Sequence, residues 1–115
     1  MSHTTITAGL VAPAVVTLVD ASTIAVNASL GNDFRVRVNG SRTIANPTGG
    51  VDGQRITFQV TQGANGLTLH WGSMYKFGAA GAPTVSTTVG STDVIGFIYN
   101  QSLASWLCAG AALGF

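Results

Sequence analysis

Apolar and polar residues alternate with a period of two along much of this chain, and this alternation constrains its fold more than any other feature. Such alternation is typical of β-strands that bury one face and expose the other. The alternating segments are residues 23–30, 34–38, 55–61 and 67–71. Residues 15–19 and 94–99 are instead almost continuously apolar. The pattern predicts an all-β protein in which these two apolar segments are covered on both faces, at a sandwich centre or a subunit interface.

Turn-forming residues separate the segments at short intervals. Asn39-Gly40 is typical of a tight hairpin, and Asn65-Gly66 suits a hairpin loop that needs positive φ. Closely spaced strands with a few long connections favour an antiparallel β-sandwich or jelly-roll-like single domain over residues 13–115, after an extended arm over residues 1–12. A small β-barrel is the alternative. The alternation predicts a core of Val36, Ile56, Phe58, Val60, Leu67, Leu69, Val94, Phe97 and Trp106.

Charged residues are scarce, because five arginines and lysines and four aspartates make up only 8% of the 115 residues. A typical soluble domain carries about 25%. A monomer of 11.7 kDa is expected to expose roughly 5,900 Å² of surface, which so few charges cannot cover. Mean hydropathy is also positive, at +0.40. We therefore expect part of the surface to be buried against other subunits, which predicts a homo-oligomer.

The net charge of +1 gives no long-range field that would steer the chain to nucleic acid or to an acidic membrane. Four of the five cationic side chains fall between Arg35 and Arg55, but no aromatic interleaving accompanies them. Solvated or interface roles are therefore favoured over phosphate binding. The first residues lack the basic and apolar regions of a signal peptide, and the apolar residues 103–115 are too few to span a bilayer. No nucleic-acid or membrane partner is predicted.

Titratable groups that could carry catalysis are few and scattered. His3 and His70 stand in no metal-ligand spacing, so a surface or interface role is favoured for both. Asp52 precedes a glycine and fits a turn, whereas Asp93 precedes an apolar strand and fits a cap on the backbone amides of a loop. Cys108 lies in an apolar run and is predicted to be a buried structural thiol. We predict no enzyme activity, no cofactor and no metal.

The aromatic residues raise the question of a carbohydrate site, because their faces can stack on sugars. Trp71 and Trp106 lie in phase with apolar neighbours, which favours core packing. Tyr75 and Phe77 flank Lys76 near a glycine-rich loop and are the candidates for an exposed contact, for which a subunit interface is favoured over a glycan. Two arginines on one strand face complete the predicted interface, which consists of Arg35, Arg37, Tyr75, Lys76 and Phe77.

A series of short motifs follows in order from Asn46 to Cys108. They are Asn46-Pro47, Asp52-Gly53-Gln54, Gln62, Gly66, Trp71, Lys76-Phe77, Pro83-Thr84-Val85-Ser86, Asp93-Val94-Ile95 and Ser105-Trp106-Leu107-Cys108. In this order and spacing they resemble the small β-domains of bacteriophage virion proteins, which occur in tail fibres and on heads. The resemblance implies a β-rich, usually oligomeric virion component, with trimers common, and it implies no catalytic residues.

Many such domains end a long fibre, whereas this sequence has no heptads or long repeat to form a shaft. We therefore expect a stand-alone head decoration or cement protein that binds and stabilises the capsid, with a tail-fibre or receptor-binding, glycan-contacting module as the alternative. Its expected partners are copies of itself, as a trimer, and the major capsid protein or other virion proteins. Its expected location is the virion, after assembly in the host cytoplasm. The uncharged segment from Ser2 to Pro13 is expected to lie along a neighbouring subunit as an added strand, and Arg35 and Arg37 to pair with capsid carboxylates.

Overall fold

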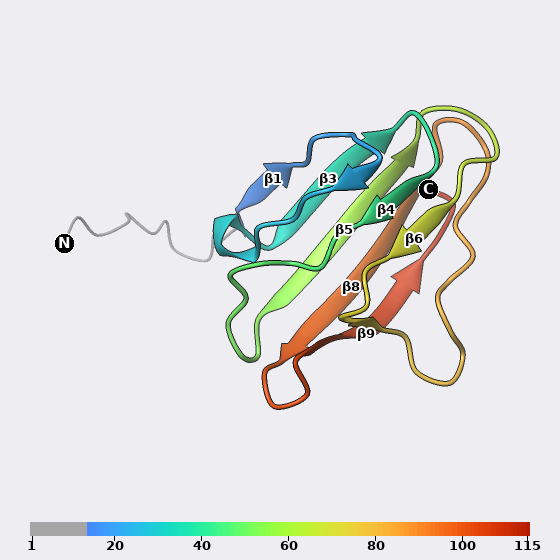
Figure 1. Cartoon of the computed structure of the whole chain (residues 1–115). Helices are drawn as coiled ribbons and strands as arrows, with labels where there is room; N and C mark the ends of the chain where they lie inside the picture. Colours follow the sequence, from blue (N-terminus) through green and yellow to red (C-terminus); the bar gives the residue numbers. More distant parts are fainter. Residues whose placement is uncertain (1–13) are drawn as a thin grey trace, which may run out of the picture.

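A computed structural model describes residues 14–115 as strands and their connections, arranged in two stacked sheets (Figure 1). The all-β prediction is therefore confirmed. The predicted arm over residues 1–12 lies outside the described residues. The elements are β1 (Val15–Thr17), β2 (Thr23–Ile24), the 3₁₀-helix η1 (Ala28–Leu30), β3 (Asp33–Val38), β4 (Arg42–Ile44), β5 (Arg55–Gln62), β6 (Leu69–Trp71), β7 (Tyr75–Lys76), β8 (Thr92–Asn100) and β9 (Ser105–Ala112).

The first six strands alternate between the two sheets. The larger sheet has the order β1-β3-β5-β8-β9-β7, and the smaller one has the order β2-β4-β6. Because the chain crosses to the other sheet after each strand, neighbours within a sheet run in the same direction, as in the parallel pairing of Phe34 with Phe58. Two strand pairs are antiparallel, β5 with β8 and β8 with β9.

This topology corrects the prediction that strand pairing is antiparallel. The turn at Asn39-Gly40 carries the chain from β3 in one sheet to β4 in the other, so it does not close a hairpin. Val38 and Ile44 are both fully buried, which shows that the apolar faces of β3 and β4 both lie against the core. The connection after β5 also changes sheets, although Gly66 has the expected positive φ of 74°. A jelly roll is antiparallel throughout, and that part of the prediction is not confirmed.

Most of the predicted core is confirmed. Val36, Ile56, Phe58, Val60, Phe97 and Trp106 are buried, and Leu67 and Leu69 are half-buried against the same cluster. The prediction that Val94 lies in the core is wrong. Val94 pairs with Gln59 on the outer face, and its neighbour Ile95 is the fully buried residue. The nearly continuous apolar run gave no indication of which residues face inward.

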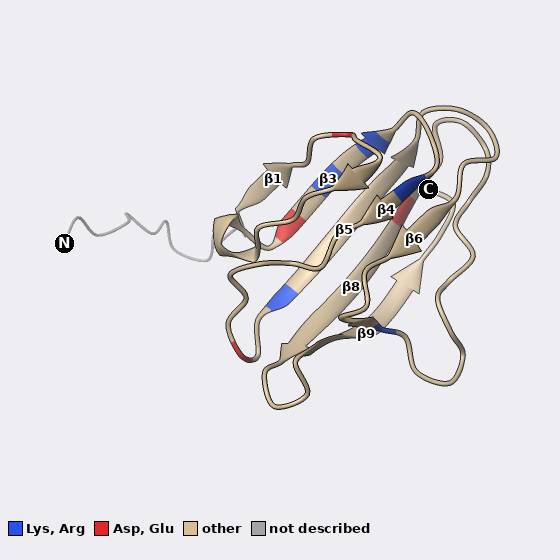
Figure 2. Cartoon of the chain, viewed as in Figure 1, with Lys and Arg blue, Asp and Glu red and all other residues tan. Residues whose placement is uncertain are grey.

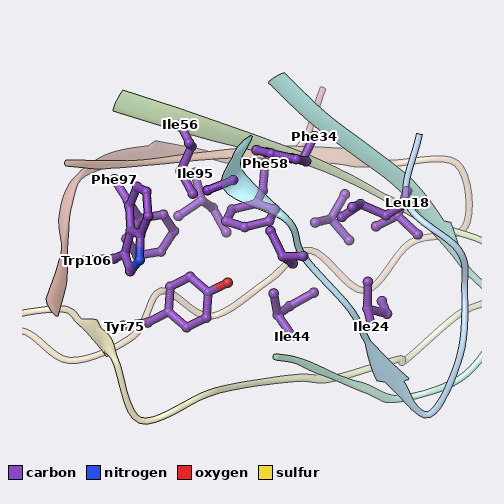
Figure 3. Packing of buried hydrophobic residues seen from close by; sticks show 14 of the residues in the cluster. Leu18, Ile24, Phe34, Ile44, Ile56, Phe58, Tyr75, Ile95, Phe97 and Trp106 are labelled. Atoms are coloured by element: carbon purple, nitrogen blue, oxygen red, sulfur yellow. The ribbon is translucent and has the colours of Figure 1, made fainter. Parts of the chain in front are cut away.

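Aromatic rings fill the middle of the core (Figure 3). Phe58 lies with its ring centroid 5.7–5.9 Å from those of Phe34, Trp71, Tyr75 and Phe97. Trp71 comes from β6 of the smaller sheet, and the other rings come from strands of the larger sheet. The predicted core role of Trp71 is therefore confirmed, and the cluster joins the two layers.

The apolar segment 15–19 does not have the cover that its sequence predicts. Leu18 is buried, but Val15 is 54% exposed and Val19 is 79% exposed. β1 is also the edge strand of the larger sheet. One side of the molecule therefore presents uncovered apolar side chains within the described residues.

Candidate interaction surfaces

The outer face of the larger sheet carries the side chains that alternate with the core residues. Figure 2 shows cationic residues along β3 and β5 on this sheet. Arg35, Arg37 and Arg55 are all exposed there, and we call these three residues the cationic strip. The strip forms because the parallel register places β3 and β5 side by side, with alternate residues of each strand facing outward.

Asp33 is the acidic residue of this face, and it binds Arg35 in the middle of the cationic strip. Its two carboxylate oxygens accept from Arg35, at 2.8 Å from Nη2 and 3.2 Å from Nε. Gln59 Nε2 lies 3.3 Å from both oxygens. The carboxylate beside Arg35 raises the pKa of its guanidinium. Arg35 is therefore oriented by a local ion pair and partly neutralised by it.

Arg37 has no ion-pair partner among residues 14–115. It lies opposite Thr61 in the register, and the hydroxyls of Thr61 and Thr92 share a hydrogen bond of 2.7 Å. A depression of about 230 Å³ opens here, lined by Thr17, Arg35, Val36, Arg37, Gln59, Thr61 and Thr92. The arrangement offers guanidinium, amide and hydroxyl groups to an external acceptor such as a carboxylate.

The other half of the same face is apolar. Val94 and Ile98 from β8 and Leu107 from β9 are half-buried, and the register places Ile98 beside Leu107. Gly96 lies between Val94 and Ile98 on this face and pairs with Gly110, so β8 and β9 carry no side chains at that position. We call Val94, Ile98 and Leu107 the apolar strip. The outer face thus combines a cationic half with an apolar half.

Tyr75 is not the exposed residue that the sequence suggested. Tyr75 is only 4% exposed, and its hydroxyl donates to the carbonyl of Ala45 at 2.7 Å. Burial raises the pKa of this phenol far above its ordinary value. Phe77 is half-buried, with its ring centroid 5.5 Å from that of Trp71 and 5.6 Å from that of Phe97. Both aromatic side chains belong to the core, which the sequence did not indicate because β7 is too short to show a period.

Lys76 is exposed and lies in register with Leu107, on the outer face. It is nevertheless distant from Arg35 and Arg37, because β5, β8 and β9 separate β7 from β3. Four strand spacings of about 4.8 Å place the two strands roughly 19 Å apart. The five predicted interface residues therefore do not form one site: two form part of the cationic strip, one lies at the far edge and two are in the core.

The candidate catalytic residues are dispersed. His70 is exposed on β6, and Cys108 is half-buried rather than buried. Asp52 lies in a turn, in agreement with its predicted role, and its carboxylate also accepts from the backbone N–H of Gln101 at 3.0 Å. In the described part of the chain, no three His, Cys, Asp or Glu side chains gather where they could hold a metal ion. His3 lies outside it.

No helix within residues 14–115 is long and apolar enough to cross a membrane. Comparison of the chain with protein-family models, with curated proteins and with solved structures found no match. The resemblance to virion domains therefore remains an expectation from the motif order.

Proposed function

We propose that this protein is a non-enzymatic structural component of a bacteriophage virion, a head decoration or cement protein that binds and stabilises the capsid. The observation that carries the proposal is the outer face, where the exposed cationic strip adjoins the apolar strip. Guanidinium groups bind carboxylates with two parallel hydrogen bonds, and apolar side chains beside them gain by leaving water. A surface of this kind fits another protein better than it fits a small substrate.

The scaffold suits this role. We assign it to the β-sandwich architecture, in which two packed sheets keep the outer face rigid. A cement protein needs many modest contacts over a broad surface, and the strips supply ionic and apolar contacts side by side. We further propose that the protein is a homotrimer whose partner is the major capsid protein or another virion protein. Three linked copies of the outer face would raise the overall affinity well above that of one copy.

The alternative is a glycan-contacting module of a tail fibre, and two of its candidate aromatic residues do not support it. Trp106 is 1% exposed and Tyr75 is 4% exposed, so neither ring can stack on a sugar. Quantitative mass spectrometry of purified particles separates the two functions. We expect many copies per particle, comparable with the number of capsid subunits. A few copies per particle would favour the fibre, and absence from purified particles would contradict both functions.

A further inference from the structure

A groove of about 420 Å³ lies between the open edges of the two sheets. One wall comes from β1 and the residues after it, and the other from the residues after β2 and after β4. The lining residues are Val16, Thr17, Leu18, Val19, Ala25, Val26, Asn27, Leu30, Ala45, Asn46 and Thr48. All of these side chains are uncharged. Seven of the eleven are also apolar, so the groove is a mainly apolar hollow at the side of the molecule.

Exposed apolar side chains gather around this groove. Val19 is 79% exposed and Leu30 is 59% exposed, and both line it. Leu30 also lines a neighbouring hollow with Ala14 and Val51, and Val51 is 67% exposed. Edge strands of soluble proteins usually carry lysine, proline or another protective device. β1 and β2 carry neither lysine nor proline, and they are protected only by their shortness, at three and two residues.

The backbone of β1 is open on its outer side. The carbonyl of Ala14 accepts from Asp33 N at 3.2 Å, and the N–H of Leu18 donates to Arg35 O at 2.8 Å. Even-numbered positions of β1 therefore face β3, and the N–H and C=O groups of Val15 and Thr17 point away from the sheet. Within residues 14–115 these groups have no backbone partner outside the strand ladders. They are positioned to pair with an added strand.

We propose that the N-terminal segment of a second copy of this chain, residues 1–13, binds along this edge and fills the groove. The segment lies outside the described residues, and the chain enters the structure at Ala14, on the rim of the neighbouring hollow. Its sequence contains no Asp, Glu, Lys or Arg, which matches an uncharged groove. Apolar residues alternate with Thr5, Thr7 and Gly9, so that one face of an added strand would carry Ile6, Ala8 and Leu10.

The sequence beside Pro13 explains why the segment should come from another copy. A tight hairpin back onto the same β1 requires positive φ in its turn, which favours Gly or Asn. Pro13 has φ fixed near −65°, and it restricts Ala12 to extended conformations. The thirteen residues can span at most roughly 43–47 Å, which is enough to reach a neighbouring molecule. Head-to-tail exchange of this kind forms a ring, such as a trimer, when the rotation between successive copies closes. The inference thus rests on the proposed oligomer, but not on capsid binding.

Light scattering coupled to size-exclusion chromatography tests the proposal at micromolar concentration. The full chain is expected to be an oligomer, whereas Leu30→Asp, Val19→Asp and a deletion of residues 2–12 should each give a molar mass near the 11.7 kDa of one chain. Leu103→Asp is the matched control, because Leu103 is 61% exposed but lies between β8 and β9. It should remain oligomeric. Circular dichroism must show that each variant keeps its strands. The two groove variants should give the same result, because both place a charge in the same groove.

Each other outcome overturns a defined part of the proposal. An oligomer that survives both groove variants would show that the interface lies elsewhere. Loss of the oligomer in the groove variants but not after the deletion would show that another part of the second copy fills the groove. Hydrogen exchange on the Val15 and Thr17 amides should be slow in the full chain and fast after the deletion. A monomeric full chain in which the Val15 and Thr17 amides exchange slowly would mean that the segment binds the groove of its own molecule. That result would overturn the exchange between copies, and binding to phage heads would still be tested separately.

Discussion

The carboxylate of Asp93 accepts hydrogen bonds from both the backbone N–H and the hydroxyl of Ser86, each at 2.7 Å. The backbone N–H of Gly114 donates to the same carboxylate at 2.9 Å. Asp93 is only 2% exposed, at the beginning of β8. One buried side chain therefore holds the connection before β8 and the C-terminal residues together, and the predicted capping role of Asp93 is confirmed.

Replacing Asp93 with Ala should lower the free energy of unfolding by at least about 2 kcal/mol, because hydrogen bonds to a charged group are lost and their buried donors are left unpaired. Urea denaturation measures the change. Asp52→Ala is the control, since Asp52 is exposed and accepts from Gln101 N alone. It should cost less than about 1 kcal/mol. Equal losses in the two variants would mean that the Asp93 network contributes little.

Truncation of Phe58 to Ala should cost about 3–5 kcal/mol, because it opens a cavity at the centre of the aromatic cluster. Phe58 is fully buried and contacts rings from both sheets. Val94→Ala should cost less than about 1 kcal/mol, since Val94 lies on the outer face. The same denaturation experiment compares them. A larger loss for Val94 than for Phe58 would show that the orientation of β8 is reversed.

An ion pair between Asp20 and Arg42 should make stability depend on acid pH. Arg42 Nε and Nη2 lie 2.7 and 2.9 Å from the carboxylate of Asp20, and these hydrogen bonds hold its pKa below the ordinary value of 3.8. The unfolded chain therefore binds this proton more readily than the folded one. The contribution is complete above pH 3.8 and is lost as the pH falls through the folded-state pKa.

Asp20→Asn removes the carboxyl group that titrates. The variant should lose less stability than the parent protein when the pH is lowered below about 4, because the amide that replaces the carboxyl group binds no proton in this range. Unfolding free energies measured across this interval provide the comparison. Identical acid dependence in the two proteins would show that Asp20 is not a source of it.

Arg37→Glu should weaken binding to phage heads at least tenfold, a change of about 1.4 kcal/mol. Arg37 is exposed and has no ion pair in the described residues, so the reversal should leave the fold intact. Lys76→Glu changes the net charge equally but lies at the far edge of the sheet, and it should bind nearly as the parent does. Co-sedimentation with heads measures both. Equal losses would indicate a general effect of net charge instead of a specific contact.

The strand content of this fold could be predicted from sequence because residues such as Phe34, Val36 and Val38 alternate cleanly. The strand pairing could not be predicted from sequence. Whether β4 joins the sheet of β3 or the facing sheet depends on packing across the core. Asn39-Gly40 specifies a turn without specifying a sheet. The burial of Tyr75 and Phe77 could not be predicted either. The strand β7 has only two residues, which is too short to show an alternating pattern. Arg35 and Arg37 could be placed on one face, but the adjoining apolar strip depends on the phase of β8.

The most direct test of the proposed function is to add the purified full chain to phage heads that lack it and to measure the temperature at which the heads release their contents. A decoration protein should bind until its sites are saturated and should raise that temperature in proportion to occupancy. Arg37→Glu, at the same concentration, should leave the temperature close to that of bare heads. Saturating binding with no gain in heat resistance would contradict a stabilising role, and no binding by the full chain would contradict the capsid as its partner.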